Sequence, residues 1–296
     1  MGWIEDAVNW VFEQIKTGAA NIIKSLYTID GLKLFDVTFS TDDIPGTVAQ
    51  LTDFSNTQNL SIYTIGSVIN KVVTPIALSL LVLFFMISLI KKFTEIEKVS
   101  WERLLLWGCY FFFIMALVQN SYTLLTKIMN IVNGIYTDIS GHLSQVSGTT
   151  SIGTAIYNTI MGYDDIGSVL IGIILYLVAA IPYLGSVIQI WTQILLRVIK
   201  LMLCMAFSPI PIAMAVEGEN YRGKAISYLM YSAGVGFEGV VILIGSWVYS
   251  LGLSQLSQNA NTGQLNVIIG LLIMNALFIA VIQLAHEFSE RMFGRS

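Results

Sequence analysis

Long apolar stretches with almost no charge are the feature that most constrains how this chain can fold. Val72–Ile90 is the clearest of them, because it carries no charge and is followed directly by Lys91 and Lys92. A helix that crosses a bilayer needs about 20 mostly apolar residues. Four further stretches approach or exceed that length: Leu104–Leu125, Ile166–Val216, Ile226–Leu251 and Leu265–Ala285. The pattern predicts an all-α, polytopic membrane protein with about five transmembrane helices.

The composition of the 296 residues supports this class. Apolar residues make up 55% of the chain and charged residues only 11%, whereas soluble domains carry about 25% charge. So few charges cannot cover a surface that faces water, which argues against a soluble enzyme. The net charge of −4 gives no basic footprint for binding nucleic acid.

The placement of lysine and arginine orients the chain, because loops on the cytoplasmic side retain positive charge. We treat Ile166–Lys200 as one long kinked span, which gives five crossings. If the N-terminus is then outside the cell, most of the lysines and arginines lie on the cytoplasmic side. The outside then holds only a minority of them: Lys16, Lys24, Lys33, Lys71 and Lys127. A six-span alternative, with Leu201–Val216 as a full crossing, puts Arg222 and Lys224 outside. We therefore expect five spans, with the C-terminus in the cytoplasm.

Residues 201–216 need a separate interpretation under the five-span topology. The stretch is short for a crossing and contains Pro209 and Pro211, each of which removes a backbone donor. Non-helical backbone at membrane depth is tolerated only where protein or water covers it. We expect a proline-broken segment that re-enters from the cytoplasmic side, within a membrane core of residues 166–285. The alternative is a proline-kinked helix end without a function of its own.

The remaining segments divide around the spans. Residues 1–71 form an exterior N-terminal region that begins with a predicted amphipathic helix, 72–125 hold the first two spans, 126–165 an exterior loop and 286–296 a cytoplasmic tail. The apolar stripe of the amphipathic helix suits either the plane of the membrane interface or a partner protein. Its members recur at helical spacing: Ile4, Val8, Val11, Ile15, Ile22 and Leu26.

A glycine-rich run occurs inside the fourth apolar stretch. Residues 234–239 match the dinucleotide-binding pattern as a string, but no strand precedes them, so that interpretation is rejected. Small residues in a membrane helix instead allow neighbouring helices to approach closely. We predict that Gly234, Gly236 and Gly239 are helix-packing positions.

Glu238 is an acid within an apolar span. A charge near the middle of a bilayer costs a few kcal/mol, so this side chain should face protein or water. Three roles are open: an ion-pair partner of Arg197 or Lys200, a group that lines a polar path, or a protonated hydrogen-bonding group. Arg197 and Lys200 are three residues apart and share one helix face, and they also suit anchoring by long side chains that reach toward water.

No enzyme signature is present in the sequence. His286-Glu287 lacks the second histidine of the zinc-protease pattern, and no nucleophile elbow or phosphate-binding loop occurs. Cys109 and Cys204 both lie in apolar stretches and suit small buried side chains rather than a disulfide. We therefore expect no catalytic residue, no metal and no cofactor.

The segment from Arg197 to about Ile244 resembles the TrbL family of membrane subunits in bacterial conjugation and type IV secretion systems, in the short form found in Gram-positive elements. In that family a cation-bearing helix leads into an apolar stretch with a conspicuous proline, followed by a polar turn and a span rich in small residues. The matching positions are Arg197, Lys200, Pro209, Pro211, Glu217, Gly218 and Gly239.

This resemblance implies a membrane-embedded channel or scaffold subunit for DNA or protein transfer across the cytoplasmic membrane. It also implies partners: a cytoplasmic ATPase, components outside the membrane, further copies of the same chain, and DNA only transiently as the transported substrate. Two alternatives remain from the residues themselves. One is a secondary transporter for a small solute or ion that uses Glu238, Arg197 and Lys200, and the other is a membrane assembly factor without transport activity.

Overall fold

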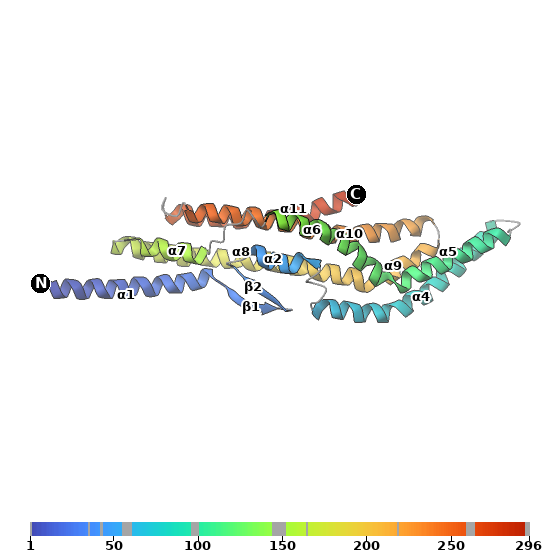
Figure 1. The fold of residues 1–296 in the computed structure, drawn as a ribbon, viewed down its shortest axis with the longest axis horizontal. Coiled ribbons are helices and arrows are strands. Elements are labelled where there is room, and N and C mark those ends of the chain that lie inside the picture. Colours follow the sequence, from blue (N-terminus) through green and yellow to red (C-terminus); the bar gives the residue numbers. More distant parts are fainter. Residues whose placement is uncertain are drawn as a thin grey trace. The chain divides into compact units, whose positions relative to one another are not determined.

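The computed structural model is helical apart from one two-stranded hairpin in the part of the chain that it describes, residues 2–34, 36–41, 44–54, 61–95, 101–143, 152–163, 165–217, 219–258 and 264–293. The helices and strands of the first half are α1 (Gly2–Tyr27), β1 (Asp30–Leu34), β2 (Val37–Ser40), α2 (Ile44–Thr52), α4 (Ser61–Glu95), α5 (Trp101–Gln119) and α6 (Ser121–Leu143). Those of the second half are α7 (Ile152–Met161), α8 (Ile166–Phe207), α9 (Pro209–Met214), the short 3₁₀ helix η1 (Ala215–Glu217), α10 (Glu219–Gln258) and α11 (Gln264–Met292). Figure 1 shows these elements in chain order.

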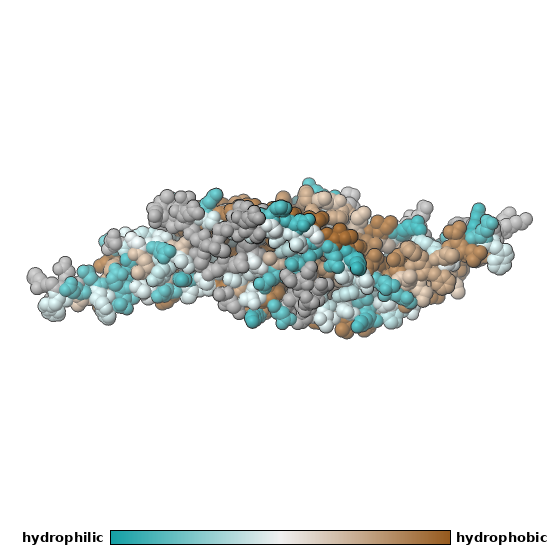
Figure 2. Space-filling view, viewed as in Figure 1, coloured by the Kyte–Doolittle hydropathy of each residue, from teal (hydrophilic) through white to brown (hydrophobic). Residues whose placement is uncertain are grey.

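Five of the described helices are long and apolar enough to cross a membrane, which confirms the predicted fold class. The candidate spans are Tyr63–Thr94, Trp101–Gln119, Ile166–Phe207, Tyr221–Leu256 and Asn266–Met292. Large apolar side chains remain exposed along them, for example Leu106 and Ile181 at 70% and 76%. Figure 2 shows apolar surface over α4 and α5. Since soluble monomers rarely expose large continuous apolar surfaces, these helices are suited to lipid.

The chain divides into two compact units. The first comprises residues 1–51, 139–194 and 241–284, and the second comprises residues 52–138, 195–240 and 285–296. The long helices α8, α10 and α11 contribute residues to both units. The two units are described separately below.

In the first unit, α1 packs on α7 (Figure 1). Gly153 of α7 lies against the backbone of Lys24, so the two helices approach closely. The buried face of α1 carries Ala20, Ile23 and Tyr27, and the Tyr27 hydroxyl donates to the carbonyl of Tyr176 over 2.8 Å. A tyrosine hydroxyl is protonated at neutral pH and can donate, and burial raises the pKa of Tyr27 further above its ordinary value.

The predicted apolar stripe of α1 is not the face that packs on α7. Its members Val11, Ile15 and Ile22 remain exposed, while the side chains of Ile4 and Val8 lie outside the described residues. Trp3 and Trp10 are also exposed. The helix is therefore confirmed, and its stripe stays open toward lipid or another protein.

The antiparallel hairpin β1–β2 was not predicted. Asp36, at its turn, adopts a left-handed backbone conformation with φ of 68°, which Asp tolerates better than most residues. Phe39 of β2 packs against Trp191 of α8, with the ring centroids 5.0 Å apart. The hairpin is thereby attached to the first unit.

Two segments differ in secondary structure from what the sequence suggested. The second span ends at Gln119 rather than Leu125, because the helix is interrupted at Asn120 before α6 begins at Ser121. Residues 126–165, expected as a loop, consist largely of α6 and α7. The sequence carries a pattern typical of α6, because residues that the structure buries recur at i, i+4 spacing. They are Ser121, Leu125, Met129 and Asn133.

The core of the second unit surrounds the proline segment. Ile212, Ala213, Ala215 and Val216 are buried against residues of α4 and α5, among them Ala77, Leu81, Ile114 and Val118. Small and medium side chains thus allow a short broken helix to pack tightly between two long ones.

Candidate functional site

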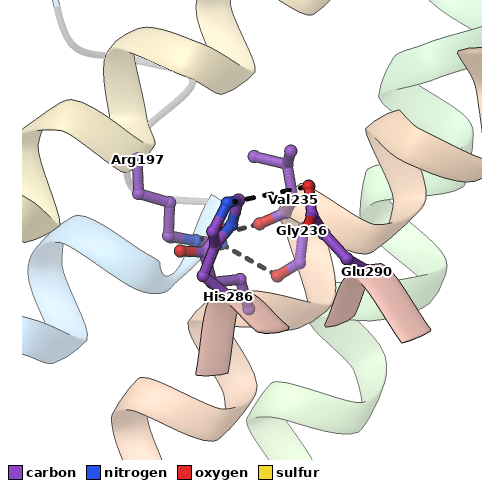
Figure 3. A network of polar contacts seen from close by, with 6 residues as sticks. Arg197, Val235, Gly236, His286 and Glu290 are labelled. Atoms are coloured by element: carbon purple, nitrogen blue, oxygen red, sulfur yellow. Dashed lines mark hydrogen bonds and ion pairs between the residues drawn. The ribbon is translucent and has the colours of Figure 1, made fainter. Parts of the chain in front are cut away.

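Arg197 of α8 is the most deeply buried cation in the described part of the second unit, 4% exposed. Its Nε donates to the carbonyl of Val235 over 3.0 Å and its Nη2 to that of Gly236 over 2.9 Å, both on α10 (Figure 3). Carbonyl oxygens replace part of the water that a buried guanidinium loses. The side chain therefore joins α8 to α10, rather than extending outward to water.

The three glycines predicted to pack helices each face a different neighbour. An added Cβ at Gly239 would overlap the Arg197 guanidinium of α8. A Cβ at Gly236 would approach Met129 Sδ of α6 to 2.8 Å, and one at Gly234 would approach Ser289 Oγ of α11 to 2.8 Å. Because glycine lacks a side chain, α10 can approach three helices at once in the second unit.

Glu238 is 5% exposed and makes its ion contact with His286, not with Arg197 or Lys200. The Oε2 atom lies 3.8 Å from His286 Nδ1. On its other side, His286 Nε2 lies 3.7 Å from Glu290 Oε1 (Figure 3). Of the three roles left open for Glu238, the ion pair with a cation of α8 is not seen among the contacts of the described residues. Arg197 is near enough to interact electrostatically with Glu238, but its donors are directed to the carbonyls of α10.

Lys200 lies one turn beyond Arg197 on α8 and is half-buried. Its side chain makes no hydrogen bond or ion pair with another residue of the described ranges. The structure therefore brings Arg197 and Glu238 close together and leaves Lys200 out of the polar contacts around them.

A pocket of about 290 Å³ opens beside Glu238 between α10 and α11. Its polar lining consists of two carboxylates, one imidazole, one ammonium and several hydroxyls, and its apolar lining includes aromatic rings. The residues are Lys224, Ser227, Tyr228, Tyr231, Gly234, Val235, Glu238, His286, Ser289, Glu290 and Phe293. We call Glu238, His286 and Glu290 the charged cluster. It is the strongest candidate for a functional site in the described residues.

The predicted proline break is present but shorter than expected. Residues 201–207 continue α8, and the helix ends at Phe207, with a turn at Ser208 before α9. Proline cannot donate a backbone hydrogen bond, so the carbonyl of Met205, four residues before Pro209, loses its helical partner. With only six residues in α9, this segment is too short to be a sixth crossing.

Asn70 of α4 supplies the missing donor. Its Nδ2 donates to the Met205 carbonyl over 2.9 Å, and the Ser208 hydroxyl donates to the same carbonyl over 3.0 Å. Both side chains are buried. A buried carbonyl without a partner is costly, so Asn70 stabilises the break that Pro209 creates.

The far end of the proline segment is also attached to α4 and α5. Lys91 Nζ lies 3.0 Å from Glu217 Oε1, and the Tyr110 hydroxyl donates to the Ala215 carbonyl over 3.0 Å. Arg222 donates to the Tyr110 hydroxyl over 3.3 Å. Pro211 is half-buried within α9, and Gly218, another position of the TrbL resemblance, lies outside the described residues.

The sequence alone did not predict a functional role for Asn70, Tyr110 or His286. Asn70 has a detectable signal, since it is a polar residue two positions before an apolar span. The contact of His286 with Glu238 has no such signal, because it depends on how α10 packs on α11.

Comparison of the chain with protein-family models, with curated proteins and with solved structures finds no match to any of them. The chain is thus assigned to a class, the multi-pass α-helical membrane proteins, by its own helices. Its role within that class is argued from the arrangement above.

Proposed function

We propose that this protein is a channel or scaffold subunit of a conjugative type IV secretion system, embedded in the cytoplasmic membrane, and that it takes part in DNA or protein transfer. The observation that carries the proposal is the order α8, α9, α10: a helix that bears Arg197, a break at Pro209 and a helix rich in glycine. That order is the one by which residues 197–244 resemble the TrbL family. The five apolar helices supply the membrane core that such a subunit requires.

The proposed partners follow from what this chain lacks and what it exposes. Its sequence contains no phosphate-binding loop, so the energy for transfer comes from elsewhere, and the TrbL resemblance assigns that role to a cytoplasmic ATPase. Exposed apolar helices such as α5 suit lipid, further copies of the chain or other channel subunits. Its acidic balance offers no basic groove for single-stranded DNA, so DNA contacts the assembly only in passage.

The proposed orientation has the N-terminus outside and the C-terminus in the cytoplasm. Lys91, Arg222 and Lys224 then lie on the cytoplasmic side, as the positive-inside rule requires. The proline segment is attached to Lys91 and lies near Arg222, which agrees with entry from that same side.

Deletion of the gene in a donor strain, with complementation by the full chain, tests the proposal. We expect deletion to abolish transfer of the conjugative element to a recipient, and complementation to restore it. A Gly223→Ala chain should complement fully, because nothing lies within 4 Å of an added Cβ there. Transfer at the parental frequency without the gene would contradict the proposal.

A secondary transporter is the second candidate, and the burial of Glu238 beside a pocket is the observation that favours it. Glu238→Gln separates the two functions. If this variant transfers DNA normally while proton-coupled uptake into proteoliposomes is lost, the chain is a transporter. If the chain is instead an assembly factor, the assembled complex should keep normal channel activity after the chain is removed.

A further inference from the structure

Arg222 of α10 is an exposed cation that lies against aromatic and apolar side chains of the second unit. Its Nε donates to the Tyr110 hydroxyl over 3.3 Å, and its guanidinium carbon lies 5.0 Å from the centroid of the Tyr110 ring. The Tyr110 hydroxyl itself donates to the carbonyl of Ala215. These contacts hold one edge of the guanidinium, and its two Nη groups make no hydrogen bond or ion pair with another residue of the described ranges.

The outer edge of this guanidinium has the chemistry of a phosphate site. Its planar fork of N–H donors matches two oxygens of a phosphate group. The carboxylate of Glu217, five residues before Arg222, is paired with Lys91 at 3.0 Å. Glu219 precedes Arg222 by three residues, and an ion pair at that spacing on an exposed helix surface is weak. Neither acid therefore replaces a bound anion at Arg222.

An apolar groove of about 300 Å³ begins at this cation. Within the described residues, Arg222 is the only charged member of the lining, and Tyr110 is the only other one with a polar side chain. On α5, Phe113 and Leu117 follow Tyr110 by about one and two helical turns, and both line the groove. On α10, Ile226 follows Arg222 by about one turn and also lines it. One polar end continued by apolar side chains is the pattern of a headgroup site followed by an acyl-chain site.

The position of Arg222 on its helix matches the depth of lipid headgroups. It is the second residue of the candidate span Tyr221–Leu256. Long cationic side chains at the end of a span reach toward the membrane interface. In the proposed orientation this is the cytoplasmic leaflet, which carries anionic lipid, and basic pockets between membrane helices on that side suit anionic headgroups.

We propose that this groove binds one anionic phospholipid of the surrounding bilayer. The Nη groups of Arg222 donate to the headgroup phosphate, and one acyl chain lies along Phe113, Leu117 and Ile226. The phosphate supplies the negative charge that the lining does not contain, and the apolar lining favours a lipid over a free phosphate ion. The site goes beyond the proposed role in secretion and does not depend on it, since all of its lining residues belong to the second unit.

Native mass spectrometry of the purified full chain in detergent, titrated with phosphatidylglycerol, tests the proposal. Phosphatidylcholine with the same acyl chains is the zwitterionic probe, and glycerol 1-phosphate is an anionic phosphate without acyl chains. For the first molecule bound, we expect phosphatidylglycerol to have the highest affinity of the three. Arg222→Gln should weaken this binding by about tenfold, because charge-assisted hydrogen bonds are lost.

Arg103→Gln is the matched control. Arg103 is exposed near the start of α5 and does not line the groove, so its loss should leave phosphatidylglycerol affinity within about twofold of the parent. Thermal midpoints verify that both variants fold. Equal affinity of the parent and Arg222→Gln, or equal affinity of the parent for the two lipids, would overturn the proposal. Glycerol 1-phosphate that binds as tightly as phosphatidylglycerol would also overturn it, because the groove would then contribute nothing.

A second pair of variants tests the acyl-chain part without changing any charge. Ile226 lines the groove and is 50% exposed, whereas Ile244 of the same helix is 41% exposed and does not line it. We expect Ile226→Trp to obstruct the groove and weaken phosphatidylglycerol binding, and Ile244→Trp to leave it unchanged. Equal affinities in these two variants would contradict the acyl-chain site. A dimer that Ile226→Trp converts into monomers would assign the groove to a second copy of the chain and would likewise overturn the proposal.

Discussion

One polar cluster in each unit shows two different ways of burying polar side chains. In the first unit, the Tyr249 hydroxyl donates to Asn275 Oδ1 over 2.5 Å, and Asn275 Nδ2 donates to Ser186 Oγ over 2.6 Å. This amide cluster joins three helices with neutral groups. In the second unit, the charged cluster has contacts of 3.7 and 3.8 Å and leaves Glu238 Oε2 without a hydrogen bond.

The difference separates a structural polar cluster from a candidate functional one. A closed set of neutral hydrogen bonds in an apolar interior stabilises helix packing. A buried carboxylate without its full set of donors does not contribute in this way and is a candidate functional group.

Gly239→Ala should have the largest effect. The new Cβ would overlap the Arg197 guanidinium, and overpacking of this kind costs about 1–3 kcal/mol. Gly223→Ala on the same helix meets nothing within 4 Å and should be neutral or stabilising by about 0.5–1 kcal/mol. Thermal midpoints in detergent measure both. Equal midpoints for the two variants would show that Arg197 does not need the space at Gly239.

Asn275→Leu and Glu238→Gln compare the two clusters directly. The first leaves the Tyr249 hydroxyl without its acceptor and should cost about 1–2 kcal/mol. The second preserves shape and removes a buried charge whose Oε2 accepts no hydrogen bond from the described residues, so it should cost less than Asn275→Leu. The free energy of unfolding in detergent gives both values. A larger loss for Glu238→Gln would make the charged cluster structural and would reverse the comparison.

Asn70→Ala tests a satisfied neutral site within the second unit. It removes the donor to the Met205 carbonyl and should cost about 1 kcal/mol. In Pro209→Ala the chain regains a backbone N–H for that carbonyl, so Asn70→Ala should cost less in that background. A double-mutant cycle measures the coupling. Strict additivity would show that Asn70 does not compensate for the proline.

Lys91→Ala should have the smallest effect. Its partner Glu217 is buried, but the Lys91 side chain is 60% exposed, and ion pairs of this kind contribute about 0–1 kcal/mol. The loss should shrink further as salt is added. A thermal shift in detergent at low and high salt checks this, with exposed Lys127 as the control position. A salt-independent loss would mean that Lys91 acts through packing.

The sequence predicted the helices better than their contacts. Length and hydropathy located all five spans, because each helix needs only its own residues to be apolar. Pro209 located the break because a missing donor is a local property. The contact between Glu238 and His286 could not be predicted, since 48 positions separate them and only the packing of α10 on α11 brings them together. Helix α6 was not predicted because polar residues interrupt its apolar stripe. Asn133 is one of them: it is buried, but as a polar residue it lowers the mean hydropathy of the segment.

Cysteine accessibility in intact cells tests the membrane topology most directly. In a chain with Cys109 and Cys204 replaced, single cysteines at Asn130 and Gln255 report the proposed exterior, and one at Lys224 the cytoplasm; all three positions are exposed. We expect a membrane-impermeant maleimide to label the first two in intact cells and the third only after permeabilisation. Labelling of the Lys224 position in intact cells, with protection of the other two, would contradict the five-span orientation.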